Sequence, residues 1–415
     1  AHLSSPCGEQ VIAGFAQEMH SRLLKENHAV PHSDADNVYR KGTGYTFSFV
    51  DPEWWGLEIF QVLEEAGVTL LLHTLVVDVT KDGDKVTGVV VENAAGRSEI
   101  GAKIVIDCTG EGDIAVRAGC DYELLPREQN EPHSVCFTMD GVDWDEFMTY
   151  MKENPDDFEL RGPIGMSKEE KIENLRKVTD PTDIGEVMGF FSILDKLLKT
   201  GEWHAYSGMG FFMAPRPDGG KNGVIQAHFQ HSAQVPNLWS CDPWDLTKGE
   251  IECRKQIIIA AKAFKKYVPG FKNAYIVKVG TEMRLRDGRR IMGDYKLRGA
   301  DVVAGARFYD CIGKSAFPAG AVHTADNHTL GSVVQEGEVG GMAPNGGSYD
   351  IPYRCLVPLK VENFLVGGKH VSTDRAAYLR FLQETVVTGQ AAGAAAGLCV
   401  KKGVTPRELE KEEHV

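Results

Sequence analysis

The chain has 415 residues, 42% of them hydrophobic, which is enough for at least two domains with separate cores. Its formal net charge of −14 makes it a poor candidate for binding nucleic acid through phosphates or for a polybasic contact with a membrane. The first residues do not pair a basic region with an apolar run, and no stretch of about 18 uncharged apolar residues predicts a membrane span.

Nine cysteines are scattered along the chain, and none forms a Cys-x-x-Cys pair. A disulfide framework or a metal site normally has closer spacing, so we expect reduced thiols in a cytoplasmic protein. We predict no metal, because no set of His, Cys, Asp and Glu has the spacing of metal ligands. Cys7, between Pro6 and Gly8, is either a reactive thiol or an ordinary cysteine.

Apolar positions at helical spacing predict a helix over residues 10–26. A second helix is expected over residues 52–67, with Asp51 as its N-cap and Pro52 in its first turn. Apolar runs then predict three strands, in VTLLLHTLVVDVTKD, KVTGVVVENAAG and SEIGAKIVIDCTG, joined by hairpin turns at DGD and NAAG.

The composition changes after Asp121, because residues 125–240 are rich in Pro, aromatic, Met and charged residues. We interpret this region as a separate substrate or cap domain. SKEE and TKGE read as capping boxes, and the second is expected to open a long helix that ends before Pro269. Residues 318–348 form a Gly-rich stretch without periodicity, which is typical of a functional or mobile loop.

Three later segments carry the chemistry. In the first, the apolar strand IVID runs into Thr109-Gly110 and then a helical stretch. The second is the short strand NFLV followed by Gly367 and Gly368. The third is a helix ending near Lys402, in which Gly389, Gly393 and Gly397 fall on one face. Such glycines predict close packing against a sheet or a ligand, whereas the first two segments alone are also compatible with ordinary turns.

Together these segments resemble the FAD-dependent oxidoreductases, relatives of the fumarate reductase and heterodisulfide reductase flavoproteins. The resemblance covers most of residues 60–125 and 247–408 and includes GVVVENAAG, IVIDCTGEGDIAVRAG, RLRDGRRIMGDY and LRFLQETVVTGQAAGAAAG. It implies an α/β fold with a Rossmann-like, glutathione-reductase-type FAD domain. Residues 125–240 match only loosely.

By this resemblance, seven residues are expected to line FAD: Val77, Thr109, Gly110, Gly367, Gly368, Arg380 and Gly389. The start of the last helix, near Arg380, is expected to face the pyrimidine side of the flavin ring. A positive helix dipole and a guanidinium there would stabilise the negative charge that collects on reduction.

The sequence departs from the family at its start. A family member opens with a strand, a G-x-G-x-x-G loop, a helix and a second strand, and the N-terminal part of this sequence contains no such loop. We therefore expect that a piece outside this polypeptide holds the FAD pyrophosphate. Three explanations remain open: a second chain supplies it, the natural protein is longer, or tight flavin binding has been lost.

Candidate catalytic residues are His323, Arg290 and Tyr353. Arg290 belongs to a cluster of four arginines that either pairs with nearby carboxylates at the surface or reaches the substrate or flavin. His323 lies in the Gly-rich stretch, where it is either a general acid or base or an exposed loop histidine. Tyr353 would place a phenol near the ring.

The sequence thus predicts an N-terminally incomplete FAD domain built from residues 1–125 and 341–415, with an inserted α+β cap domain at 126–340. The predicted function is transfer of hydride or electrons between FAD and a small organic substrate, within a homo- or hetero-oligomer. The alternative is a non-catalytic or partial subunit that keeps the scaffold and acts through assembly. A nicotinamide-only dehydrogenase is disfavoured, because the matching segments belong to the later half of the flavin fold.

Overall fold

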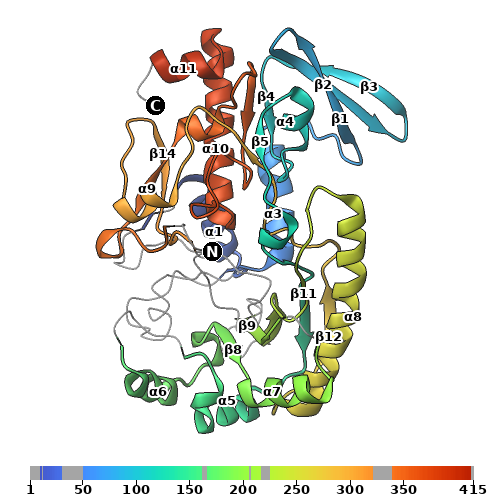
Figure 1. The fold of residues 1–415 in the computed structure, drawn as a ribbon, viewed down its shortest axis with the longest axis vertical. Helices are drawn as coiled ribbons and strands as arrows, with labels where there is room; N and C mark the ends of the chain where they lie inside the picture. Colours follow the sequence, from blue (N-terminus) through green and yellow to red (C-terminus); the bar gives the residue numbers. More distant parts are fainter. Residues whose placement is uncertain are drawn as a thin grey trace.

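The computed structural model describes residues 10–11, 13–29, 50–160, 166–204, 207–215, 225–320 and 339–412. The meander β1–β3 and the long helix α10 lie at one end of the molecule, and helices α5–α8 with strands β8, β9 and β12 lie at the other (Figure 1). His323 and Cys7 lie outside the described residues, so the structure neither supports nor opposes their predicted roles.

The helices with their bounds are α1 Gly14–Lys25, α3 Pro52–Glu65, α4 Asp113–Ala118, α5 Trp144–Glu153, α6 Lys168–Lys177, α7 Phe191–Thr200, α8 Pro243–Tyr267, α9 Gly299–Ala304, α10 Leu382–Lys402 and α11 Pro406–Glu412. The strands are β1 Leu75–Asp82, β2 Lys85–Asn93, β3 Gly96–Gly101, β4 Val105–Asp107, β5 Tyr122–Glu123, β6 His133–Ser134, β7 Phe137–Asp140, β8 Glu186–Gly189, β9 Met209–Pro215, β10 Ile225–Phe229, β11 Gln234–Val235, β12 Tyr275–Val279, β13 Arg290–Ile291, β14 Cys311–Ser315, β15 Tyr349–Pro352 and β16 Phe364–Val366.

Helix α3 begins as the sequence predicts. Pro52 takes the first helical position, and the Asp51 carboxylate accepts hydrogen bonds from the backbone N–H groups of Glu53 and Trp54. These bonds satisfy two of the donors that every helix leaves unpaired at its start. The predicted hairpin turns are also confirmed, since β1, β2 and β3 form an antiparallel meander in chain order.

The first predicted strand is shorter than expected. It begins at Leu75, and residues 68–72 before it have no regular secondary structure and no described strand beside them. Leu70, Leu71 and Leu72 are 41%, 55% and 58% exposed. Because consecutive side chains of an extended segment point in opposite directions, neither side of this segment is covered.

Strands β4 and β16 lie side by side although more than half of the chain separates them. They pair in parallel, with Val105 opposite Phe364 and Asp107 opposite Val366. Within the described residues they form a two-stranded sheet, so the other edge of β4 has no strand partner. The carboxyl ends of both strands therefore meet at one edge, where ligands bind in open α/β sheets.

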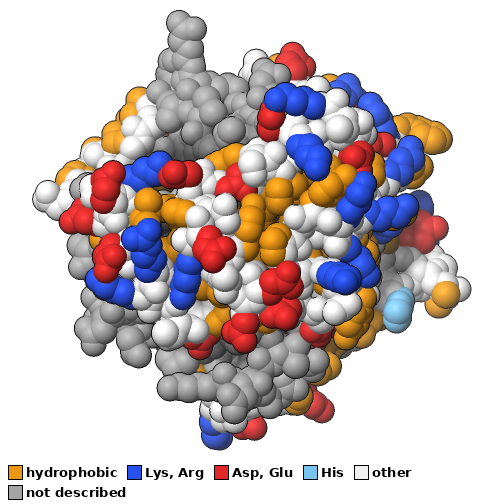
Figure 2. Space-filling model, turned by 90° about the horizontal axis from the view of Figure 1, so that it is seen from below, with side chains coloured by type: hydrophobic (Ala, Val, Ile, Leu, Met, Phe, Trp, Pro, Cys, Tyr) orange, Lys and Arg blue, Asp and Glu red, His pale blue; other side chains and the backbone are white. Residues whose placement is uncertain are grey.

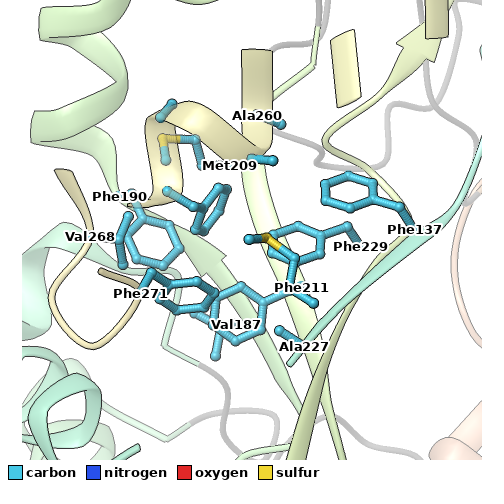
Figure 3. Close-up of a cluster of buried hydrophobic side chains, with 14 of the residues drawn as sticks. Phe137, Val187, Phe190, Met209, Phe211, Ala227, Phe229, Ala260, Val268 and Phe271 are labelled. Carbon is cyan, nitrogen blue, oxygen red and sulfur yellow. The ribbon is translucent and has the colours of Figure 1, made fainter. Parts of the chain in front are cut away.

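The other end of the molecule is a five-stranded sheet in the order β12-β7-β10-β9-β8. Aromatic side chains from its strands and from α8 pack into one core (Figure 3). Phe137 and Phe229 stack with ring centroids 4.3 Å apart, and Phe229 meets Phe264 edge-on at 4.8 Å. Burial of such rings is the main stabilising contribution to this part.

One capping box was predicted correctly and one was wrong. Ser167 and Glu170 form the reciprocal bonds at the start of α6. Helix α8, however, begins one turn before the predicted box, because the Asp242 carboxylate caps it and Pro243 takes the first position. The Thr247 hydroxyl lies inside the helix and donates to the Pro243 carbonyl.

Two separate hydrophobic clusters form the cores. One lies within residues 135–283, and the other joins residues 16–120 to residues 291–409. Buried residues from 291 to 319, which the predicted cap includes, belong to the second cluster, and the inserted cap and its boundaries stay predictions. No described helix is both long and apolar enough to cross a membrane.

Candidate functional site

The turn after β4 is held by one buried carboxylate. Asp107 is 1% exposed, and its Oδ1 accepts from the backbone N–H and hydroxyl of Thr109 at 2.8 and 2.7 Å. Its Oδ2 accepts from the N–H groups of Ile114 and Ala115 at 3.0 and 2.8 Å. The first free donors of α4 are therefore satisfied within the chain, and the shape of the turn is fixed.

This turn presents open backbone at the end of the β4–β16 pair. Gly110 has φ +83° and Gly368 has φ +104°, conformations that favour glycine. A Cβ atom added at Gly110 would meet only Lys369 Cε, at 3.9 Å. Cys108 and Thr109 beside it are exposed. A flat, bulky ligand can therefore approach the backbone here.

Helix α10 packs tightly on this edge at only one of its glycines. A Cβ atom at Gly367 would lie 3.3 Å from the Gly389 Cα, and the Gly368 N–H donates to the Thr388 hydroxyl at 2.9 Å. Cβ atoms added at Gly393 or Gly397 would meet nothing within 4 Å. The close approach of β16 to α10 therefore depends on Gly367; a Cβ atom at Gly389 would also meet no described atom within 4 Å, so the expected close packing of the glycine face stays a prediction.

The start of α10 carries a buried glutamate. Glu384 is 1% exposed, accepts from the Ser315 hydroxyl, and accepts from the Phe381 N–H at 3.3 Å. Burial raises the pKa of Glu384 to about 7. Near neutral pH this side chain is therefore protonated far more often than an ordinary glutamate, next to Arg380.

Arg380 joins a buried ionic cluster that links the two parts of the molecule. Its Nε lies 2.9 Å from Glu131 Oε1, and the Arg286 Nε lies 3.6 Å from Glu131 Oε2. All three side chains are 5% exposed or less. Removing one partner from such a buried pair leaves an uncompensated charge, which is strongly destabilising.

Arg290 belongs to the same cluster through Asp287. The Arg290 guanidinium donates to Asp287 Oδ1 at 2.7 Å and lies 4.5 Å from the centre of the Tyr378 ring. The backbone N–H of Glu131 donates to Asp287 Oδ2 at 3.3 Å. Burial raises the pKa of Tyr378 well above its ordinary value, so this phenol stays protonated.

A second buried carboxylate, that of Glu111, connects the Thr-Gly turn to neighbouring segments. Glu111 is 5% exposed, and its carboxylate accepts from Lys369 Nζ and from the Ser240 hydroxyl. Arg289 donates to the Glu111 carbonyl at 3.2 Å and to Asp113 at 2.7 Å. The turn, the arginine segment and the segment after β16 are thus held together by charge.

Two buried histidines stay neutral at physiological pH. Burial, aided by the charge of Lys369, lowers the pKa of His133 to about 4. The Arg286 N–H donates to its Nδ1 at 3.2 Å, so Nε2 carries the hydrogen, and Nε2 has no described partner. Burial likewise lowers the pKa of His370 to about 4, and its Nε2 lies 3.7 Å from Asp107. The described residues hold no cluster of His, Cys, Asp and Glu suited to a metal ion.

The structure brings most of the predicted site residues to one region. Thr109, Gly110, Gly367, Gly368 and Gly389 surround the ends of β4 and β16, while Arg290 and Arg380 lie in the buried cluster.

Val77 lies in the β1–β3 meander and Tyr353 in a hydrophobic core. Val77 occupies a register shift between β1 and β2, where the ladder is interrupted. The Tyr353 ring is fully buried, and its hydroxyl donates to the Pro406 carbonyl at 3.1 Å. That contact is typical of a structural tyrosine, so its catalytic role stays an untested prediction.

Sequence reasoning missed the acidic members of the site, namely Asp107, Glu111, Glu131, Asp287 and Glu384. Asp107 had a usable signal, because a carboxylate at the end of an apolar strand with a Thr two residues later is typical of a capped turn. Asp287 had a signal too, because it lies three residues before Arg290, and pairing of the arginines with nearby carboxylates was one of the two interpretations. Glu131 had none, since the residues that it joins are far apart in the chain.

Over residues 1–414 the chain matches the profile of the family described as FAD dependent oxidoreductase. The chain therefore belongs to this family of enzymes, and FAD is its cofactor, as the sequence predicts. A search of curated proteins finds no match.

Several solved structures show a distant similarity. They include the L-proline dehydrogenase from P. horikoshii (12% identity, 89% of this chain and 62% of that chain, TM-score 0.32). Others are CabE, an aromatic hydroxylase from angucycline biosynthesis (14%, 69% and 46%, TM-score 0.35), and a geranylgeranyl bacteriochlorophyll reductase-like protein from Thermoplasma acidophilum (13%, 59% and 44%, TM-score 0.34). The chain thus spans 44% to 62% of their lengths. At these TM-scores the similarity carries no argument about activity.

Proposed function

We propose that this chain exchanges hydride or electrons between FAD and a small organic substrate. The observation that carries the proposal is the open Thr109-Gly110 backbone beside the start of α10, with the buried cluster of Arg290 and Arg380 next to it. An active site needs such a ligand-accessible edge beside fixed charges. When bound, FAD supplies the redox chemistry, and the protein positions and tunes it.

The residues present fit the ring-bearing part of FAD. Gly110 and Gly368 leave room for a flat group, and the N-terminus of α10 with Arg380 favours electron-rich atoms. Thr109, Gly367 and Gly389 complete that edge, and Val77 is proposed to contact the cofactor from the meander. The substrate is proposed to lie between this edge and the cap, near Arg290, with His323 as acid or base.

We further propose that a separate strand–loop–helix–strand piece holds the FAD pyrophosphate. This piece would come from a longer natural chain or from a partner. Three described surfaces support it: the unpaired edge of β4, the exposed segment Val68–Leu72, and the open glycine face of α10. An added strand would bury leucines that now lie in water, at about 25 cal/mol per Å² of apolar area.

Arg380→Ala tests the flavin assignment. We expect the variant to retain less FAD or to show a shifted flavin reduction potential, because a buried positive charge near the ring is lost. Bound FAD is measured by absorbance near 450 nm together with protein concentration, and the potential by dye equilibration, on protein whose fold is checked by circular dichroism because Glu131 also loses a partner. Arg176→Gln, an exposed arginine of α6, is the control. Unchanged flavin content together with an unchanged reduction potential would show that Arg380 does not act on the flavin.

The state of the purified protein tests the remainder of the proposal. A yellow protein whose intact mass exceeds that of the 415 residues, or which co-purifies with a second polypeptide, is expected. A colourless, well-folded chain would instead support the alternative function, a partial subunit that acts through assembly. We also propose a cytoplasmic location, with which the free cysteines of the described ranges agree. Oligomer formation is proposed as well.

A further inference from the structure

Ser134 and Arg284 form an isolated antiparallel pair on the cap side of the buried cluster. The Arg284 N–H donates to the Ser134 carbonyl at 2.6 Å, and the Ser134 N–H donates to the Arg284 carbonyl at 3.3 Å. Residues that are directly opposite in an antiparallel pair project their side chains to the same side. The Ser134 hydroxyl and the Arg284 guanidinium therefore face the same space.

Neither group is fully satisfied within the described residues. Ser134 is completely buried, and its hydroxyl has no hydrogen-bond partner. The Arg284 guanidinium donates to the neutral amide oxygen of Gln230 at 3.0 Å, and no described carboxylate lies within ion-pair distance. Leaving a buried hydroxyl unpaired costs about 1–3 kcal/mol, and a partly buried guanidinium without a counter-charge costs more.

Charged groups around Arg284 act on it in both directions. Burial lowers the pKa of Arg284, and the positive charge of Arg380 acts in the same direction, whereas Cys136 and then Glu131 act in the opposite direction. Glu131, however, lies within ion-pair distance of both Arg380 and Arg286. An anionic group placed between Ser134 and Arg284 would relieve both the repulsion and the unpaired hydroxyl.

We propose that Ser134 and Arg284 bind a carboxylate group of the substrate. One oxygen would accept from the guanidinium and the other from the hydroxyl, so two donors match the two oxygens of a carboxylate. A phosphate fits less well, because it has more acceptor oxygens than these two side chains can satisfy. This inference rests on the proposed function, since Arg380 connects the pair to the flavin-lining edge.

Calorimetric titration of the purified FAD-containing protein tests the proposal. Succinate and acetate are compared with the matched neutral amides succinamide and acetamide, and with inorganic phosphate, at constant ionic strength. We expect a carboxylate to bind at least tenfold more tightly than its amide. Arg284→Gln should weaken carboxylate binding at least tenfold and Ser134→Ala about threefold, whereas Arg176→Gln should leave it unchanged.

The outcomes separate this inference from the proposed function. Equal binding of acid and amide, tighter binding of phosphate, or unaltered affinity in Arg284→Gln would overturn the carboxylate subsite. Flavin content and flavin spectrum are measured on every sample. A protein that retains its flavin but does not bind carboxylates would refute the carboxylate subsite and leave the proposed function standing. If Arg284→Gln fails to fold, Arg284→Lys keeps the charge but loses the planar fork, and it should still weaken binding.

Discussion

A single buried carboxylate decides the shape of the proposed cofactor edge. Asp107 accepts four hydrogen bonds from the turn that follows it, and no other side chain reaches these donors in the described residues. Its carboxylate has enough lone pairs for all of them. A neutral amide has one acceptor oxygen, so it cannot replace the carboxylate.

Asp107→Asn should therefore destabilise the protein by about 3 kcal/mol, because an NH2 group would face N–H donors. Urea unfolding, followed by circular dichroism, measures the change. Asp84→Asn, an exposed aspartate in the turn between β1 and β2, should change stability by less than about 0.5 kcal/mol. Equal effects of the two substitutions would contradict the role given to Asp107.

The buried Glu384 makes stability depend on pH in a defined direction. Its pKa is about 7 in the folded chain against an ordinary value of 4.5. Between these values the folded protein holds a proton that the unfolded chain has released, so the free energy of unfolding falls as pH rises from about 4.5 to 7, by at most about 3 kcal/mol. Glu384→Gln removes this loss. The free energy of unfolding of the variant minus that of the wild type should be larger at pH 8 than at pH 5, as measured by urea unfolding. Parallel pH profiles of the two proteins would refute the raised pKa of Glu384.

At the scale of elements, Gly367 and Gly393 differ in how closely other atoms approach them. A methyl group at Gly367 would lie 3.2 Å from Cys108 Sγ and 3.3 Å from the Gly389 backbone, which is tighter than most real contacts. A methyl group at Gly393 would meet nothing within 4 Å and would sit inside helix α10. The first contact resists substitution, whereas the second position tolerates it.

Gly367→Ala should therefore destabilise the chain by about 1–2 kcal/mol, because β16 and α10 must move apart. Gly393→Ala should stabilise it by up to about 1 kcal/mol through higher helix propensity. Thermal unfolding of both variants measures the difference. Opposite signs are the expected result, and a stabilised Gly367→Ala would show that the close contact is wrong.

Local signals in the sequence were sufficient for several elements but not for the site. Asp51 and Pro52 predicted the start of α3 because a cap acts within one turn. The predicted start of α8 was wrong because the prediction took Thr247 as the cap. Asp242 caps the helix instead, and Pro243 after it takes the first helical position. The buried pairs of Glu131 join segments more than 150 residues apart, and no local rule predicts such contacts.

At the scale of the whole molecule, one face of the surface shows how charged and apolar side chains are arranged. On the face shown in Figure 2, acidic and basic side chains are interspersed with apolar ones. A continuous basic area, which a nucleic-acid backbone requires, is not seen among the described atoms of this face. The apolar side chains exposed along Val68–Leu75 are a different kind of surface, and we interpret them as the contact for the completing piece.

The two hydrophobic cores share no buried side chain, and polar bonds through Glu131 and Glu111 cross between them. Heating should therefore produce two heat-absorption peaks rather than one in a calorimetric scan. Flavin binding should raise only the transition of the unit with β4 and α10, because a ligand stabilises the state that binds it. A single peak that shifts as a whole on adding FAD would contradict this expectation.

Such a division has a consequence for how the protein changes over time. A cap with its own aromatic core tolerates substitutions on its inner surface without disturbing the unit that holds the cofactor. Under the proposed function, new substrate preferences are expected to arise in the cap while the flavin-binding unit stays constant. Ser134 lies near the start of the proposed cap, and substitutions there are expected to change substrate preference early.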